Sequence, residues 1–270
     1  MGDRAYEAQI DELMQWFQEN EKLPKEIDRL LLKRFYECMY RNVEDTKKLI
    51  RINYKLRNKY DHIFLDRDPN SEQSQNTFAY ADLIPLPGLT PENYKVSCYR
   101  LHDFDHKKMN HIEDTKSFFM VTDCRFCIPD LPDSDQLSEG EVQIFDMNGF
   151  SMKHFSRMTI GTMRIYLKFL QEAFPVRLKA VHLINCPTYL DKIVSVVKPF
   201  INREVFKMIH FHTNGINGLY EHVPRSMLPE EYGGDCGSFE KLKAQTMLLL
   251  QQKRSYLIDS QHWKIELKCD

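Results

Sequence analysis

Apolar residues recur at helical spacing through the first quarter of the chain. The first run places apolar side chains at i, i+3, i+4 and i+7, which is one face of an α-helix, at Ile10, Leu13, Met14 and Phe17. The same spacing returns over residues 30–38 and 43–60. We therefore predict a group of helices that ends near residue 62, followed by a polar linker over residues 66–76.

Beyond the linker, short apolar runs alternate with longer amphipathic segments. The runs predicted as strands are VSCYRL (96–101), VQIFDMNG (142–149), AVHLIN (180–185) and MIHFH (208–212). The segments predicted as helices are residues 115–127, 151–174, 187–200 and 239–254. Such alternation is typical of a parallel sheet with crossover helices. Because AVHLIN is apolar on both faces apart from His182, we predict that it is a central parallel strand.

The segment 187–201 has a wide apolar face. On a helical wheel, its apolar residues fall within an arc of about 160°, and they are Tyr189, Leu190, Ile193, Val194, Val196, Val197, Phe200 and Ile201. Packing against a core accounts for such a face. A second reading is a helix that covers a cavity with one edge and meets a membrane with another. The pattern alone leaves both open.

Composition and charge narrow the class of protein. The 270 residues include 37 basic and 39 acidic side chains, so the net charge of −2 provides no global field for nucleic acid. The seven cysteines are scattered, and the polar start MGDRAYEAQ does not have the pattern of a signal peptide. We therefore expect free thiols in a reducing, cytoplasmic compartment. No apolar run approaches the roughly 20 residues that span a bilayer.

Several motifs resemble catalytic or metal sites, but each lacks a partner. Cys124 and Cys127 form a CxxC without a second pair of ligands, and the histidines of residues 102–111 lie in a lysine-rich segment typical of a solvated turn. Ser151 follows a predicted strand, but Lys153 replaces the glycine of a nucleophile elbow, so we predict a helix N-cap. There is no dinucleotide fingerprint and no P-loop. We predict no enzyme, no cofactor and no metal.

Polar residues interrupt the last two predicted strands. His182, His210 and His212 are interpreted as core histidines with hydrogen-bond partners. Arg177 and Lys179 alternate with apolar residues at the start of the strand 180–185, and the period of two puts both charges on one side. Such a pair is either simply hydrated at the protein surface or binds a phosphate group. The residues alone leave both open.

Five segments, in this order and spacing, resemble the CRAL-TRIO lipid-transfer family: IFDMNGF (144–150), FPVRLKAVHLINCP (174–187), VKPF (197–200), IHFH (209–212) and LPEEYGG (228–234). The likeness is to the branch that contains α-tocopherol transfer protein and cellular retinaldehyde-binding protein. It implies an α/β fold with a helical N-terminal domain over 1–65. A lipid-binding domain with a C-terminal helix would follow over 77–270. There, a mostly parallel sheet would floor an apolar pocket that a lid helix closes.

The resemblance also implies a set of ligand-binding residues. These are Met120, Asp123, Cys127, Phe145, Met152, Tyr166, Phe169, Leu170, Phe174, Val176 and Val181, together with Ile193, Val194 and Val197 of the lid segment. Most are apolar, which suits an elongated hydrocarbon ligand. Asp123 stands where the tocopherol protein has a small polar residue, and Glu141 stands where an apolar residue is expected. A carboxylate in an apolar pocket is costly unless paired or protonated, which argues against tocopherol itself.

A phosphoinositide site is implied by a few basic residues. Arg57, Arg177 and Lys179 match the family pattern, whereas Glu204 and Met208 occupy two positions where it has basic residues. The neighbouring Lys207 is expected to compensate, so the resemblance implies weaker or altered headgroup binding.

The functional prediction is an intracellular carrier of a hydrophobic small lipid, such as a retinoid or tocopherol. It would contact membranes transiently, with help from a phosphoinositide and with no nucleic-acid partner. The departures from the family pattern leave open a scaffold or signalling protein that keeps the fold without the cargo.

Overall fold

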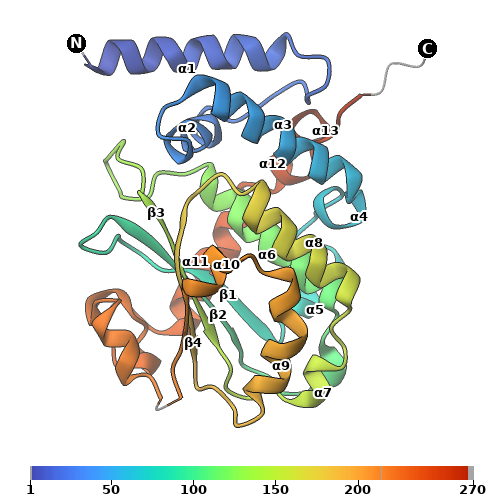
Figure 1. The fold of residues 1–270 in the computed structure, drawn as a ribbon, viewed down its shortest axis with the longest axis vertical. Helices are drawn as coiled ribbons and strands as arrows, with labels where there is room; N and C mark the ends of the chain where they lie inside the picture. The colour runs from blue at the N-terminus through green and yellow to red at the C-terminus, as the bar shows by residue number, and fades with distance from the viewer. Residues whose placement is uncertain (1, 214, 267–270) are drawn as a thin grey trace.

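The computed structural model describes residues 2–213 and 215–266, which are built around one five-stranded sheet (Figure 1). The strands follow the order of the chain: β1 (Ala81–Pro85), β2 (Tyr94–Leu101), β3 (Gly140–Asp146), β4 (Leu178–Ile184) and β5 (Ile209–Phe211). β1 pairs antiparallel with β2, and the other three pairs are parallel. The predicted α/β fold with a mostly parallel sheet is confirmed, with β1 added as an unpredicted antiparallel edge.

The first four helices gather at one end of the molecule (Figure 1). They are α1 (Gly2–Gln18), α2 (Arg29–Cys38), α3 (Val43–Lys59) and α4 (Asp61–Phe64). Ile10, Leu13 and Phe17 of α1 are fully buried, as the spacing predicts. Side-chain caps fix where two of these helices begin. The carboxylate of Asp28 accepts hydrogen bonds from the first turn of α2, and the amide oxygen of Asn42 does the same for α3.

The predicted polar linker is irregular only in its first half. Ser71 accepts a hydrogen bond from the backbone N–H of Ser74 at 3.2 Å and begins α5 (Glu72–Phe78). This short helix buries Phe78 against the sheet domain. The prediction of a linker over residues 71–76 is therefore wrong, because a serine cap and one apolar anchor make a helix there.

The helices of the sheet domain follow the predicted order, with two breaks and three short helices that the pattern did not predict. They are α6 (His111–Phe126), α7 (Met152–Phe155), α8 (Ile160–Glu172), α9 (Leu190–Val197), α10 (Arg203–Lys207), α11 (Phe239–Gln252), α12 (Arg254–Ile258) and α13 (Ser260–Trp263). Short 3₁₀ turns lie at η1 (His106–Lys108), η2 (Lys198–Phe200), η3 (Asn217–Glu221), η4 (Arg225–Met227) and η5 (Glu230–Tyr232). The single helix expected over 151–174 is divided into α7 and α8, because Thr159 caps a second start. Ser151 caps α7, as predicted.

The wide apolar helix expected over 187–200 is shorter than predicted. α9 ends at Val197 and tightens into η2, where Pro199 has no N–H to continue the α-helical bonding. The strand β4 is parallel to both neighbours, but it lies next to the edge strand β5 rather than at the centre of the sheet. Its residues are accordingly half-buried over much of its length.

Two further features concern the molecule as a whole. The six cysteines within the described ranges are free thiols, and Cys269 lies outside these ranges. Over residues 2–213 and 215–266, the structure contains no helix with both the length and the apolar character that crossing a bilayer requires.

Candidate functional site

An apolar cavity of about 360 Å³ lies between the sheet and the segment that joins β4 to β5. Each of the five strands contributes side chains to it, and the strand residues at its wall include Leu83, Tyr99, Leu101, Phe145, Val181, Leu183, Ile209 and Phe211. Successive side chains of a strand point to opposite faces, so one face of β4 and β5 supplies this floor. The volume falls within the range of about 300–1,000 Å³ that small-molecule sites occupy.

The helix α9 forms the roof of the cavity. Its inner face contributes Leu190, Ile193, Val194 and Val197, and the chain beyond it adds Lys198, Ile201 and Phe206. Ile193 is buried, whereas Val196 on the outer face is 37% exposed. The helix therefore covers a cavity rather than only a packed core, as the second reading of its apolar face predicted. The membrane contact in that reading stays a prediction.

Side-chain hydrogen bonds hold this roof segment at both ends. At its start, the hydroxyl of Tyr189 donates to the backbone carbonyl of Phe150. At its end, the amide of Gln171 on α8 donates to the carbonyl of Phe200 at 3.0 Å and accepts from the N–H of Asn202 at 2.7 Å. Gln171 thus bonds the backbone on both sides of the turn between η2 and α10.

Two polar residues of the cavity wall, Asp114 and Tyr80, are hydrogen-bonded to each other. The carboxyl group of Asp114 accepts a hydrogen bond from the hydroxyl of Thr77 at 3.0 Å and bonds the hydroxyl of Tyr80. Burial raises the pKa of Asp114 to about 6, although both hydrogen bonds oppose that shift. Arg100, Asp146 and Lys198 also border the cavity, but the surface facing it is almost entirely hydrocarbon, so a bound molecule would meet few polar partners.

The expected ligand-binding residues fall into two groups. Those at the cavity wall are Phe145, Val181, Ile193, Val194 and Val197. Those outside it are Met120, Asp123, Cys127, Met152, Tyr166, Phe169, Leu170, Phe174 and Val176. Most of the second group packs into the main apolar core beneath the N-terminal helices. Met120 packs instead with α11 residues, and Met152 is 39% exposed on α7.

An aromatic cluster fills the space between the cavity and the N-terminal helices. It consists of Phe64, Phe118, Phe119, Tyr166 and Phe169, with ring centroids between 4.5 and 6.0 Å apart. The ring of Tyr99 joins this cluster to the cavity, because it lies 5.1 Å from Phe118 and 4.8 Å from Phe145. A ligand in the present cavity therefore ends at Tyr99 and Phe145 instead of extending toward α4.

Asp123 is a buried ion-pair partner rather than a cavity residue. Its carboxylate receives two hydrogen bonds from Arg57, at 2.8 and 2.7 Å, and a third from Arg67. The side chains of Arg57 and Asp123 are each 1% exposed. Arg57, expected at the phosphoinositide site, is therefore enclosed in the core and has no surface to offer a headgroup.

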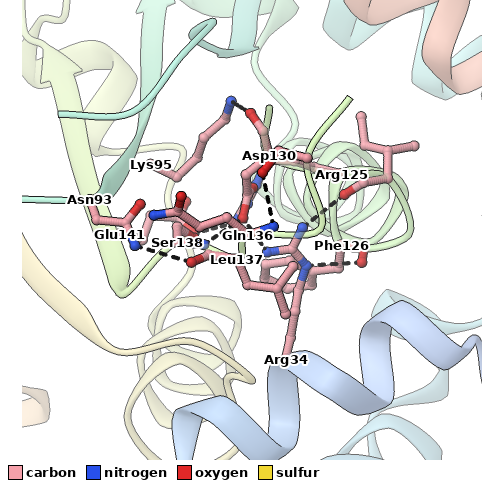
Figure 2. Close-up of polar contacts among 12 residues, drawn as sticks. Arg34, Asn93, Lys95, Arg125, Phe126, Asp130, Gln136, Leu137, Ser138 and Glu141 are labelled. Atoms are coloured by element: carbon pink, nitrogen blue, oxygen red, sulfur yellow. Dashed lines mark hydrogen bonds and ion pairs between the residues drawn. The ribbon is translucent and has the colours of Figure 1, made fainter. Parts of the chain in front are cut away.

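A second buried cluster of charges explains Glu141. Figure 2 shows Arg34 reaching from α2 toward Asp130, with Arg125 and Glu141 beside it. Arg34 lies 2.7 Å from one carboxylate oxygen of Asp130, and Arg125 lies 3.2 Å from the other. Arg125 also contacts Glu141 at 2.5 Å. Burial lowers the pKa of the neighbouring Lys95 to about 8, with Arg125 acting in the same direction. The cluster joins α2 to the sheet, and none of its residues lines the cavity.

The remaining basic residues of the expected phosphoinositide site occupy three different settings. Arg177 donates to the carbonyl oxygens of Glu37 at the end of α2 and of Glu139, at 2.5 and 3.0 Å. The ammonium group of Lys179 lies 5.1 Å from the centre of the Tyr94 ring. Lys207 is exposed and pairs with Glu204 at 2.9 Å. Arg177 is thus hydrogen-bonded to an N-terminal helix, whereas Lys179 and Lys207 have their described partners elsewhere.

The sequence reasoning missed most of the floor. Tyr99, Leu101 and Leu183 line the cavity but were not among the expected residues. The period-two alternation of β2 and β4 contains the signal, since Leu183 lies two residues after Val181 and shares its face. The roof residues Ile201 and Phe206 follow the break at η2, which the pattern of the helix did not reveal.

Two family models match the chain in series. The model described as CRAL/TRIO domain matches residues 81–234, and the model described as Pinta-like, UBA domain matches residues 3–74. The first match contains all five strands and the cavity roof. It covers more than half of the 270 residues.

Two curated relatives and one solved structure resemble this chain over different lengths. The "Alpha-tocopherol transfer protein-like" protein of Homo sapiens is 24% identical over 231 residues, which is 85% of this chain and 65% of that protein. "Clavesin-1" of Xenopus laevis is 33% identical over 110 residues, or 41% of this chain and 33% of clavesin-1. The crystal structure of Sfh5 shares the fold with a TM-score of 0.51, at 14% identity and 94% coverage of both chains. This chain thus spans less than two thirds of the length of these two curated relatives.

Proposed function

The chain belongs to the CRAL/TRIO domain family, and we propose that it is an intracellular carrier that binds a hydrophobic small lipid in the cavity beneath α9. The family consists of lipid-binding transfer proteins. The name of the human relative refers to tocopherol transfer, and a retinoid, a tocopherol or a similar lipid is the class of cargo that we propose here.

The observation that carries this proposal is the apolar wall of the cavity, to which all five strands and α9 contribute. Binding would be driven by removal of ligand hydrocarbon from water, at about 25 cal/mol per Å². A ligand whose polar group entered the deep part of the cavity would leave that group without a partner, which is unfavourable. We therefore propose that the cargo is held by its hydrocarbon part. The binding step needs no covalent chemistry.

Exchange would take place at membranes, with transient and peripheral contact. Opening of the roof would expose the inner face of α9, and that apolar surface would then face lipid. We propose that a phosphoinositide headgroup assists this step at Lys179, Lys207 and Arg177. For the headgroup to promote release, it must bind the open form more tightly than the closed form.

Native mass spectrometry of the purified protein, after incubation with a membrane lipid extract, tests the carrier proposal. We expect one hydrophobic small lipid bound per chain. Val194→Trp should abolish binding, because Val194 points into the cavity. The matched control is Val196→Trp on the outer face of the same helix, which should bind as the wild type does. Folded wild-type protein that takes up no lipid from any extract would refute the carrier and favour the scaffold.

A further inference from the structure

Four histidines gather on the face of the sheet opposite the cavity. Val181 and Leu183 of β4 line the cavity, so His182 between them points to the other face, and His210 of β5 does the same. The ring centre of His182 lies 4.9 Å from that of His210, 4.7 Å from His222 and 5.2 Å from His212. We name these four residues the histidine cluster.

A hydrogen bond inside the histidine cluster limits how many protons it can hold. Nδ1 of His182 lies 2.9 Å from Nε2 of His212, and a bond between two ring nitrogens contains one proton. If both rings were protonated, two N–H groups would face each other and the bond would be lost. The other nitrogen of His182, Nε2, is buried without a partner, and the residue is 0% exposed. A charge on His182 would therefore be desolvated and unpaired.

The surroundings offer little compensation for added positive charge. Among the described residues, Glu221 acts to raise the pKa of His212, but burial and the neighbouring histidines outweigh it. The thiol of Cys186 belongs to a residue whose backbone N–H bonds the carbonyl of His212. Ile144 of β3 pairs with His182 in register and is apolar. No group of three or more histidines, cysteines or carboxylates within the described ranges is placed to hold a metal ion. Protonation is the remaining chemistry open to four adjacent imidazoles.

The histidine cluster is directly connected to the roof of the cavity. The chain between β4 and β5 is the segment that contains α9, η2 and α10. β5 has only three residues, pairs only with β4, and carries His210 between two cavity residues, Ile209 and Phe211. Repulsion that moved β5 away from β4 would therefore disturb the floor of the cavity and one end of its roof together.

We propose that the histidine cluster is an acid-sensitive switch that loosens β5 and the roof segment, so that the cavity opens when the surrounding pH falls. As a means of unloading cargo, this inference rests on the carrier function proposed above, but the structural change itself does not. His222 is exposed, so the cluster has one member in contact with solvent.

The direction of the titration agrees with this geometry. Burial lowers the pKa of His182 to about 3, with His222, His210 and His212 acting in the same direction. Burial also lowers the pKa of His210 and of His212. A histidine whose pKa is lowered in the closed form binds its proton more readily in an open form. Closure is therefore fully favoured above the usual histidine pKa and weakens as the pH falls below it.

Hydrogen–deuterium exchange of the full chain, measured at about pH 7.4 and about pH 5.5, tests the switch without any ligand. After correction for intrinsic exchange rates, we expect amides of residues 190–211 to lose about tenfold in protection at the lower pH, the change that corresponds to one pKa unit. The double variant His210→Gln, His222→Gln should show no such loss. His222→Gln alone is the milder variant if the double variant does not fold. His62→Gln, an exposed histidine on α4, is the matched control and should behave as the wild type does.

Release of bound all-trans-retinol, followed by its fluorescence at the same two pH values, tests the consequence for cargo. Faster release at low pH in the wild type, and not in the double variant, would support the switch. Acid loosening in the exchange experiment without retinol binding at any pH would count against retinol as cargo and still support the switch. Equal protection at both pH values, or an equal loss in the double variant, would overturn it.

Discussion

Arg57 and Asp123 form a two-point ion pair in the core, with both guanidinium nitrogens of Arg57 within 2.8 Å of the carboxylate oxygens. Arg67 bonds the same carboxylate, so one anion holds two buried cations. Burial alone would raise the pKa of Asp123, but the two arginines lower it below its usual value. Asp123 therefore stays charged and connects α3 to α6. The residue that the family resemblance placed in a ligand pocket is part of the framework on which the cavity is built.

Replacing Asp123 by asparagine should destabilise the fold strongly. The variant would leave two arginines buried without a counter-charge, and breaking one partner of a buried pair typically costs about 3–5 kcal/mol. Urea denaturation followed by circular dichroism measures the loss. The control is Glu204→Gln, since the Glu204–Lys207 pair is exposed and its removal should leave stability unchanged. If the urea midpoint of Asp123→Asn equalled that of the wild type, the ion pair would have no role in stability.

Acid should weaken the fold through Asp130. Burial acts to raise the pKa of Asp130, but Arg34 and Arg125 outweigh it and lower the value from 3.8 to about 2. For a carboxyl group whose pKa is lowered by folding, the stabilisation is complete above its unfolded pKa and is lost as the pH falls toward the folded one. We expect a loss of roughly 2 kcal/mol between about pH 4 and pH 2 from this group.

The free energy of unfolding of the wild type and of Asp130→Asn, measured across that range, separates this contribution from those of other carboxyl groups. The variant should be less stable at neutral pH, because Arg34 loses its counter-charge. Its stability should also fall less steeply with acid. Two curves of equal slope would show that Asp130 does not titrate with unfolding.

Sequence patterns predicted the fold better than the site, and particular residues show why. The apolar run of β4 and the alternation of strands with helices along the chain are local properties, so a mostly parallel sheet could be predicted. The partners of Asp123 come from Arg57 and Arg67, 66 and 56 positions away in the chain. A local pattern cannot distinguish a carboxylate that faces two arginines from one that faces a ligand. The same holds for the histidine cluster, because His222 lies outside the predicted strands and only packing brings it to His182.

Gln171 should slow the opening of the cavity. Its side-chain amide makes two hydrogen bonds to the backbone on either side of the turn that ends the roof. Gln171→Ala removes both hydrogen bonds, each of which contributes about 1 kcal/mol to the closed form. The equilibrium should therefore shift toward the open form by a factor of roughly 10 or more. Stopped-flow measurement of retinol release to lipid vesicles should show a rate that is faster by about that factor.

The control for Gln171→Ala is Lys168→Ala on the same helix. Lys168 pairs with Glu172 on an exposed surface, so its side chain is not one that bonds the backbone of the roof. Its release rate should equal that of the wild type. If both variants released retinol equally fast, the effect would belong to α8 in general and not to the bonds across the turn.

Arg177 combines two roles that a single substitution can separate. Its guanidinium group bonds the carbonyl oxygens of Glu37 and Glu139, and it also carries a charge proposed to assist headgroup binding. Arg177→Lys keeps the charge and loses the fixed fork of donors, so the variant should be less stable by about 1–3 kcal/mol. Lys179→Gln removes a charge that has no part in holding α2.

Retinol release to vesicles with and without a phosphatidylinositol bisphosphate then reports on the charge alone. The lipid should still accelerate release from Arg177→Lys, and should accelerate it less from Lys179→Gln. The double variant Arg177→Glu, Lys179→Glu should take up retinol and show no acceleration, because two acidic groups repel the phosphates. Acceleration equal to that of the wild type in this double variant would remove the phosphoinositide from the exchange mechanism. The bonds of Arg177 to Glu37 and Glu139 would then describe a structural residue, whose contribution is to hold α2 against the sheet.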